Sequence, residues 1–129
     1  MRDWTACIAH LGVTSHHDVR WLKWAQVGVA PLAPLTHLLP GGTAVGAVRG
    51  IALSGDHVIA TGSCNADGAR LISSGQWLPE VDLDPRESDG VRVGRVTVMR
   101  RAIVMRIVLG QLTVWDDLWI RLAPHAAVP

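Results

Sequence analysis

Residues 43–63 read TAVGAVRGIALSGDHVIATGS, and this stretch decides the fold class of the chain. Residues 43–53 and 57–63 are rich in β-branched and apolar side chains, and the segment Ser54-Gly55-Asp56 separates them. Two such runs joined by a short glycine-containing loop are typical of a β-hairpin. We therefore predict two antiparallel strands joined at Gly55.

Similar runs recur on both sides of this hairpin, separated by Gly, Pro, Asn and Asp. Gly94 would place a bulge in one run, and Pro79 indicates an edge strand or a bulge in another, because proline cannot donate to a ladder. Closing apolar strands into a barrel removes their exposed edges. We therefore expect a mainly β (α+β) fold, a small closed or nearly closed β-barrel of about six to seven strands with one short helix. The further strands are predicted over residues 4–11, 76–84, 91–98, 103–109 and 111–122, the last with a turn at Asp116-Asp117.

The best helix signal covers residues 67–74. Asn65 or Asp67 suits the N-cap, because a short side chain with an oxygen can accept a hydrogen bond from the first turn. Gly75 follows the last turn, where a residue in the left-handed region commonly ends a helix. A short helix is therefore predicted directly after the hairpin.

The segment before the hairpin is less regular. Residues 14–18 form a polar cluster typical of a loop, and residues 19–30 are ambiguous between a short helix and irregular structure. Pro31, Pro34 and Pro40 restrict the backbone around several leucines. This pattern favours an extended, partly buried segment over a regular helix.

The composition is that of a folded and nearly neutral domain. Of 129 residues, 49% are hydrophobic and 18% are charged, which excludes a disordered chain. The net charge of +1 provides no broad field that would favour nucleic acid or an anionic membrane as a partner. The absence of a leader-like segment and of a long apolar run leads us to expect a soluble intracellular chain. We expect a single domain over residues 1–122 and a C-terminal tail over residues 123–129.

Cysteine and tryptophan usage narrows the kinds of site to consider. Cys7 and Cys64 lie far apart and show no CxxC spacing, so we predict two free thiols, with neither a zinc site nor a disulfide framework. The chain has six Trp but no Phe and no Tyr. Because indoles fill large volumes, these residues are expected to fill the core or to anchor contacts.

Four segments, in this order, resemble the prohead (capsid maturation) proteases of tailed phages, particularly the form common in phages of actinobacteria. Each segment alone is a short match, and the shared order and spacing carry the resemblance, which covers most of residues 4–84. It implies a protease-like β-barrel. The segments are WTACIAHLGVTS at 4–15, PLAPLT at 31–36, VGAV at 45–48 with GDHVIATG at 55–62, and ARLISSG at 69–75 with VDLD at 81–84.

The resemblance also implies a catalytic pair that this chain lacks. Proteases of this family resemble the herpesvirus type, in which a Ser nucleophile is activated by a His. In the family pattern the nucleophile immediately precedes Val-Asp, and here Glu80 precedes Val81-Asp82. The family histidine lies just before the "VGxI" strand, where residues 40–43 read PGGT without an imidazole. A carboxylate cannot replace the hydroxyl in acyl transfer, so we expect a pseudoprotease with Glu80 at a degenerate catalytic position and with no cofactor.

A shifted alignment leaves one enzymatic alternative open. In it His37 would be the base and Ser73 or Ser74 the nucleophile of an active prohead serine protease. Both serines come at the end of the predicted helix, just before Gly75. Hydroxyls at that position more often satisfy free backbone carbonyls or face solvent, and we favour this interpretation.

Other polar clusters are interpreted as surface features, and we predict no metal site. His16-His17-Asp18 shows no third spaced ligand, and His57 beside Asp56 is expected to be a surface histidine. The acidic residues 82, 84, 87 and 89 lack the order of an EF-hand and are expected to form a solvated loop. Two groups are candidate interface residues, the basic Arg95, Arg100 and Arg101, near Arg106, and the tryptophans Trp115 and Trp119.

A protease-like barrel that has lost its catalytic Ser and His can still bind a partner protein. We therefore expect a virion structural protein, a minor capsid or decoration protein bound to the major capsid protein in several copies or as a homo-oligomer, and assembled in the host cytoplasm. No membrane and no specific nucleic acid are expected as partners. The second alternative is another β-rich virion part, such as a head-completion or tail protein.

Overall fold

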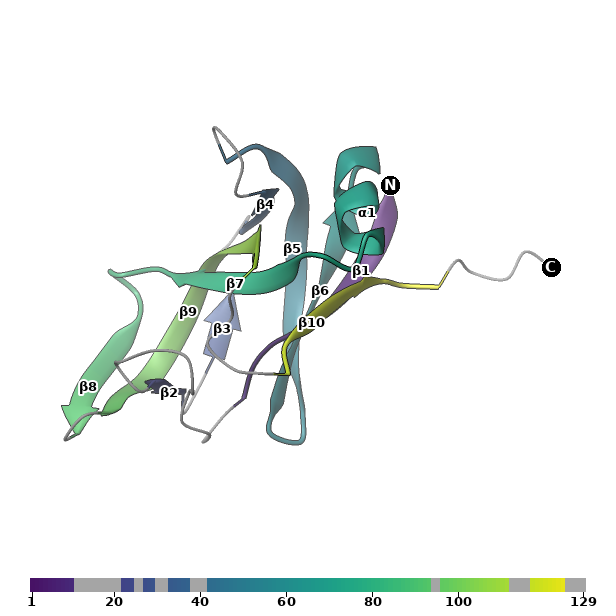
Figure 1. Ribbon diagram of the computed structural model, residues 1–129. Coiled ribbons are helices and arrows are strands. Elements are labelled where there is room, and N and C mark those ends of the chain that lie inside the picture. The colour runs from purple at the N-terminus through teal and green to yellow at the C-terminus, as the bar shows by residue number, and fades with distance from the viewer. Residues whose placement is uncertain are drawn as a thin grey trace.

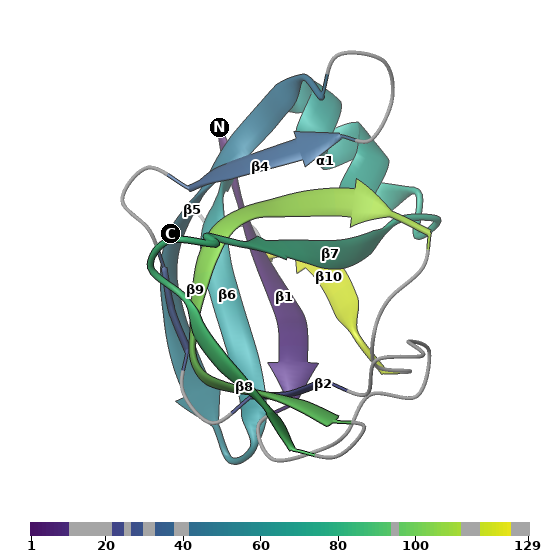
Figure 2. The same cartoon turned by 90° about the vertical axis from the view of Figure 1, so that its left-hand side faces the viewer.

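The computed structural model describes residues 1–10, 22–24, 27–29, 33–37, 42–93, 96–111 and 117–124. Within them the chain forms a strongly curled, half-barrel β-sheet with one short helix, which confirms the expected mainly β, barrel-like fold (Figures 1 and 2). The elements are β1 (Arg2–His10), β2 (Leu22–Trp24), β3 (Val27–Val29), β4 (Pro34–His37), β5 (Ala44–Ser54), β6 (His57–Cys64), α1 (Ala66–Ser73), β7 (Leu78–Leu83), β8 (Asp89–Val93), β9 (Val96–Gly110) and β10 (Trp119–Leu122).

The predicted hairpin is confirmed. β5 and β6 are antiparallel, and Ser54 pairs with His57, so that only Gly55 and Asp56 connect the strands. Gly55 has a φ of +60°, a conformation that side chains with a Cβ rarely adopt. The glycine therefore makes this tight reversal possible.

The sheet follows the order β10-β1-β6-β5-β4-β9-β2. β1 lies between β6 and β10 and is antiparallel to both. The curl of the sheet brings β7 and β9 in front of β1 and β6 in the view of Figure 2. The apolar faces of the strands are thereby turned toward one another.

Strand β9 differs from the sequence prediction. We expected one strand over residues 91–98 with a bulge at Gly94, and a separate strand over residues 103–109. Instead, β8 and β9 are antiparallel, and Val93 pairs with Val96. A glycine within an alternating run is compatible with a bulge or with a chain reversal, and the sequence alone does not say which strand will be the partner.

Strand β9 is also the partner of the irregular N-terminal segment. β2, β3 and β4 all run parallel to it. The residues of β2 and β3 are therefore neither helical nor irregular, which corrects the two alternatives considered for 19–30. The extended segment predicted around Pro34 is confirmed as β4, which also pairs with β5. The polar cluster 14–18 lies outside the described residues.

Helix α1 follows the predicted signals. Oδ1 of Asn65 accepts a hydrogen bond from the Gly68 N–H at 2.9 Å, which identifies Asn65 as the N-cap. Gly75 has a φ of +72°, and its N–H donates to the carbonyl of Ile72. The helix packs against β10, β5 and β6. The caps therefore set both ends of the helix.

Pro79 lies in β7, and within the described residues β7 pairs with β9 alone. This is the edge position expected for a strand that contains proline. The last predicted strand, 111–122, is shorter in the structure, where β10 begins at Trp119 and Asp117 lies in a turn. Ala123 donates its N–H to the Asp3 carbonyl, so the described part of the predicted tail continues the ladder by one residue.

Trp4 is the largest side chain of the core and is 1% exposed. Its Nε1 donates to the carbonyl of Ser63 at 2.9 Å. Cys7 and Cys64 are buried and free, as predicted, and burial is the main cause that raises the pKa of both thiols. Within the described residues, no helix is both long and apolar enough to cross a membrane.

Candidate functional site

The serines of the protease alternative lie at the end of α1. The hydroxyl of Ser73 donates to the carbonyl of Ala69, and that of Ser74 donates to the carbonyl of Leu71 at 2.7 Å. Both hydroxyls therefore satisfy backbone carbonyls at the helix end, as the favoured interpretation predicted. His37 lies on β4, but its side chain is outside the described part of the structure.

We expect these two hydroxyls to contribute little beyond helix capping. The double variant Ser73→Ala/Ser74→Ala should lose less than about 1 kcal/mol of unfolding free energy, because both groups are exposed and water can replace their hydrogen bonds. Urea denaturation followed by far-ultraviolet circular dichroism measures this value. A loss of several kcal/mol would contradict the assignment.

Glu80 lies on β7, opposite Val108 of β9, and is half-buried. Its carboxyl group lies directly over Gly110, where an added Cβ would come within 2.5 Å of Glu80 Cδ. The glycine thus leaves the space that this carboxylate occupies. Glu80 is a packed side chain of the sheet.

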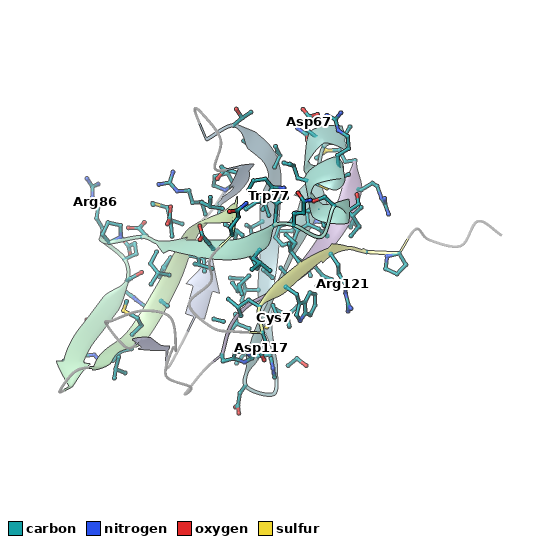
Figure 3. All side chains as sticks on the ribbon, viewed as in Figure 1. Cys7, Asp67, Trp77, Arg86, Asp117 and Arg121 are labelled. Atoms are coloured by element: carbon teal, nitrogen blue, oxygen red, sulfur yellow. The ribbon has the colours of Figure 1, made fainter. Side chains whose placement is uncertain are left out.

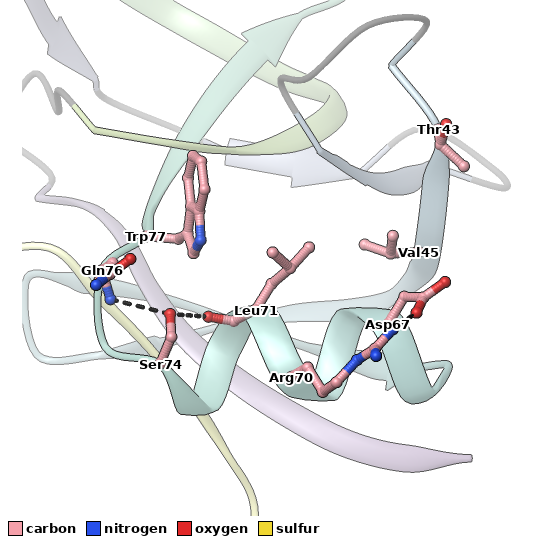
Figure 4. Close-up of a pocket in the computed structure, with 8 residues that line it drawn as sticks. All are labelled: Thr43, Val45, Asp67, Arg70, Leu71, Ser74, Gln76 and Trp77. Atoms are coloured by element: carbon pink, nitrogen blue, oxygen red, sulfur yellow. Dashed lines mark hydrogen bonds and ion pairs between the residues drawn. The ribbon is translucent and has the colours of Figure 1, made fainter.

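A pocket of about 580 Å³ lies between α1 and the beginning of β5 (Figure 4). Val45, Leu71 and Trp77 provide its apolar lining. Asp67 and Arg70 line its polar part and form an ion pair with each other. The pocket therefore presents no unpaired charge from these two residues.

The candidate basic interface residues on β9 have acidic or carbonyl partners. Arg100 forms an ion pair with Asp89 at 3.1 Å, and Nε of Arg101 donates to the carbonyl of Glu87 at 2.8 Å. Their neighbour Arg106 pairs with Asp82 in the same way. Asp82 and Asp89, which were expected in a solvated loop, lie in β7 and β8 and neutralise Arg106 and Arg100, whereas the carbonyl partner of Arg101 carries no charge. Arg95 lies outside the described residues.

Trp119, the other described candidate for an interface, packs against the core and is only half-buried. The guanidinium of Arg121 lies over its ring, 4.4 Å from the centroid, in a cation–π arrangement. This contact gives the exposed side of the indole a partner within the chain. Trp115 lies outside the described residues.

The topology brings together three residues that the sequence prediction did not combine. His10 ends β1 and is the direct ladder partner of His57, which begins β6. On the other side of β1, Cys7 pairs with Trp119, so the turn residue Asp117 comes near the same end of β1. Figure 3 shows Asp117 at this end, close to Cys7. We call His10, His57 and Asp117 the histidine–aspartate cluster.

The members of this cluster are in direct contact. Nε2 of His10 lies 2.5 Å from Oδ1 of Asp117, a hydrogen bond in which the imidazole donates to the carboxylate. The rings of His10 and His57 meet edge to face, with centroids 4.2 Å apart and an interplanar angle of 74°. His10 is 6% exposed, whereas His57 and Asp117 face solvent. One buried and two accessible polar groups therefore share one small volume.

These neighbours shift the pKa of the Asp117 carboxyl group. Desolvation acts to raise its pKa, but the hydrogen bond from His10 and the charges of His10 and His57 outweigh it, so the pKa is lowered. The carboxylate form of Asp117 is therefore favoured.

His57 is expected from the sequence to be a surface histidine, and it does lie at the surface, but its ring contacts that of His10. The sequence predicts His10 only as part of a strand and Asp117 only as part of a turn. Two histidines on predicted β-strands are a signal for a possible joint site. Whether they meet depends on the register in which the two strands pair, and the sequence does not give that register. The alternative metal cluster at residues 16–18 lies outside the described residues.

Comparison with known proteins adds no relative: no protein-family model, no curated protein and no solved structure matches this chain.

Proposed function

We propose that this chain is a structural protein of a tailed-phage virion, a minor capsid or decoration protein on a prohead-protease-like barrel without the catalytic Ser and His. The observation that carries the proposal is Glu80, which stands where the resemblance puts the nucleophile. Its carboxyl group is packed over Gly110. A carboxylate cannot replace the serine hydroxyl in acyl transfer.

The described parts of the resembling segments belong to regular elements of the sheet and to the helix. They fall on β1, on β4, on the β5–β6 hairpin, and on α1 followed by β7. The hydroxyls of Ser73 and Ser74, which the enzymatic alternative requires as nucleophiles, donate to backbone carbonyls.

The surface formed by Val91, Arg100 and Arg101 is the docking surface that we assign to the capsid partner. Val91 is 40% exposed, and both arginines are exposed. The ion pair of Arg100 with Asp89 is solvent-exposed, and such pairs contribute about 0–1 kcal/mol to folding. An acidic surface of the major capsid protein can therefore replace the local partners at little cost to the fold.

The composition of purified particles tests the proposal directly. We expect quantitative mass spectrometry of virions to find the chain in a number of copies that scales with the major capsid protein. Only a few copies per particle would favour the head-completion or tail alternative. Absence from particles would overturn the proposal, and so would processing of capsid subunits that stops in the Ser73→Ala or Ser74→Ala variant.

Reversing the charge of the docking surface should weaken capsid binding. The double variant Arg100→Glu/Arg101→Glu is expected to bind purified capsid shells about tenfold more weakly, equivalent to about 1.4 kcal/mol. Co-sedimentation at low and high salt measures this loss, and higher salt should also weaken the wild type. Arg70→Glu, which changes an exposed arginine on α1, is the control and should bind like the wild type. Equal loss in both variants would exclude this surface.

A further inference from the structure

The histidine–aspartate cluster offers two imidazole nitrogens and one carboxylate oxygen at one place. This donor set is the one that Zn²⁺ and related divalent first-row ions take in sites with three protein ligands. We propose that His10, His57 and Asp117 form a binding site for a divalent transition-metal ion, with Zn²⁺ as the representative ion and one coordination position open to solvent. The inference rests on the contacts of these residues and is independent of the proposed virion role.

The distances suit such an ion. The three ligand atoms all lie within 4.8 Å of one another. Bonds of about 2.0–2.1 Å in tetrahedral geometry require ligand atoms to be about 3.3 Å apart. The hydrogen-bonded pair His10–Asp117 would open slightly, and His57 would move inward. Both adjustments are available, because the side chains of His57 and Asp117 are exposed while His10 is held in the core.

Charge favours the same arrangement. The two imidazole rings, with centroids 4.2 Å apart, are close enough for one cation to bind a nitrogen of each. The Asp117 carboxylate supplies the anionic oxygen of the ligand set. The cluster thus carries one negative charge to meet a divalent ion.

Cys7 lies near the cluster but is not part of the proposed site. The group of residues whose ligand atoms lie within 4.8 Å of one another contains His10, His57 and Asp117 and not Cys7. The thiol is buried, and its sulfur lies 3.9 Å from the carbonyl oxygen of Ala9. The ligand set is therefore two nitrogens and one oxygen, without sulfur.

A bound ion would join segments that are distant in sequence. It would link the end of β1, the beginning of β6 and the turn before β10, which are neighbours only in the folded sheet. Because the unfolded chain does not present these groups together, the ion should bind the folded state selectively and raise its thermal stability.

The test uses tag-free, full-length protein that has been treated with a chelator and then titrated with Zn²⁺ by calorimetry. We expect one equivalent of Zn²⁺ to bind and the thermal midpoint to rise. His57→Gln and Asp117→Asn should each lower the affinity more than about a hundredfold, beyond the roughly 10–100-fold loss typical of residues that only orient a ligand. Circular dichroism of the exposed-site variant His57→Gln verifies that its fold is unchanged.

Two matched controls separate the cluster from other sources of zinc binding. Asp56→Asn changes the exposed acid beside His57, outside the cluster, and should bind like the wild type. His16→Gln/His17→Gln removes the adjacent histidine pair of the sequence and should also bind like the wild type. The proposal is overturned if the wild type does not bind Zn²⁺, if His57→Gln binds as tightly as the wild type, or if only the His16/His17 variant loses the ion.

Discussion

Gly62→Ala is expected to destabilise the protein by about 3 kcal/mol or more, because the site has no room for a methyl group. Gly62 is buried on β6 and pairs with Trp4 of β1 on one side and Val48 of β5 on the other. An added Cβ would overlap the carbonyl oxygen of Ala47 and lie 2.6 Å from Cζ2 of Trp4. Because backbone lies on one side and a buried indole on the other, the added methyl group cannot fit unless one of them moves.

Urea denaturation of Gly62→Ala and Gly50→Ala compares a position that has no space for a Cβ with one that has. Gly50 lies on the neighbouring strand β5, and an added Cβ there has no atom within 4 Å. We expect Gly50→Ala to change stability by no more than about 0.5–1 kcal/mol, in the stabilising direction, because alanine restricts the unfolded chain. Equal destabilisation of both variants would contradict the close packing of β6 between β1 and β5.

Trp4→Ala is the second change with a large expected effect, a loss of about 3–5 kcal/mol of unfolding free energy. Trp4 is 1% exposed, and its indole fills the core between strands that cannot easily close the resulting cavity. The variant also removes the hydrogen bond that Nε1 donates to Ser63. Since small domains are stable by about 5–15 kcal/mol, such a loss would leave the fold marginal.

Trp119→Ala is the matched control for this prediction. Its indole is only half-buried and faces Arg121, so the loss should be clearly smaller. Chemical denaturation followed by circular dichroism avoids the change in fluorescence that accompanies the loss of a tryptophan. If Trp119→Ala costs as much as Trp4→Ala, the assignment of Trp4 as the main core residue is wrong.

The capsid role and the metal site are proposed from different observations. The proposed capsid role depends on the resemblance, which puts Glu80 at the position of the nucleophile. The metal site depends on contacts among His10, His57 and Asp117. Capsid binding can therefore fail while zinc binding succeeds, and the reverse also holds.

Local chemistry explains what could be predicted from the sequence. The β5–β6 hairpin depends on Gly55 at its turn, and α1 depends on Asn65 and Gly75 at its ends. Each of these signals acts on residues that are only a few positions away. The mainly β class follows from the same short-range patterns.

Partner choice among distant strands was decided only by the tertiary structure. The sequence did not show that β9 runs through residues expected in two strands, or that β2 and β3 pair with it in parallel. It also did not show that β1 lies between β6 and β10, which brings His57 and Asp117 to His10. A shift in register by one residue turns a side chain to the opposite face, and short β-patterns are compatible with several registers. The hairpin and helix were therefore determined by neighbouring residues, whereas the histidine–aspartate cluster exists only through long-range strand pairing.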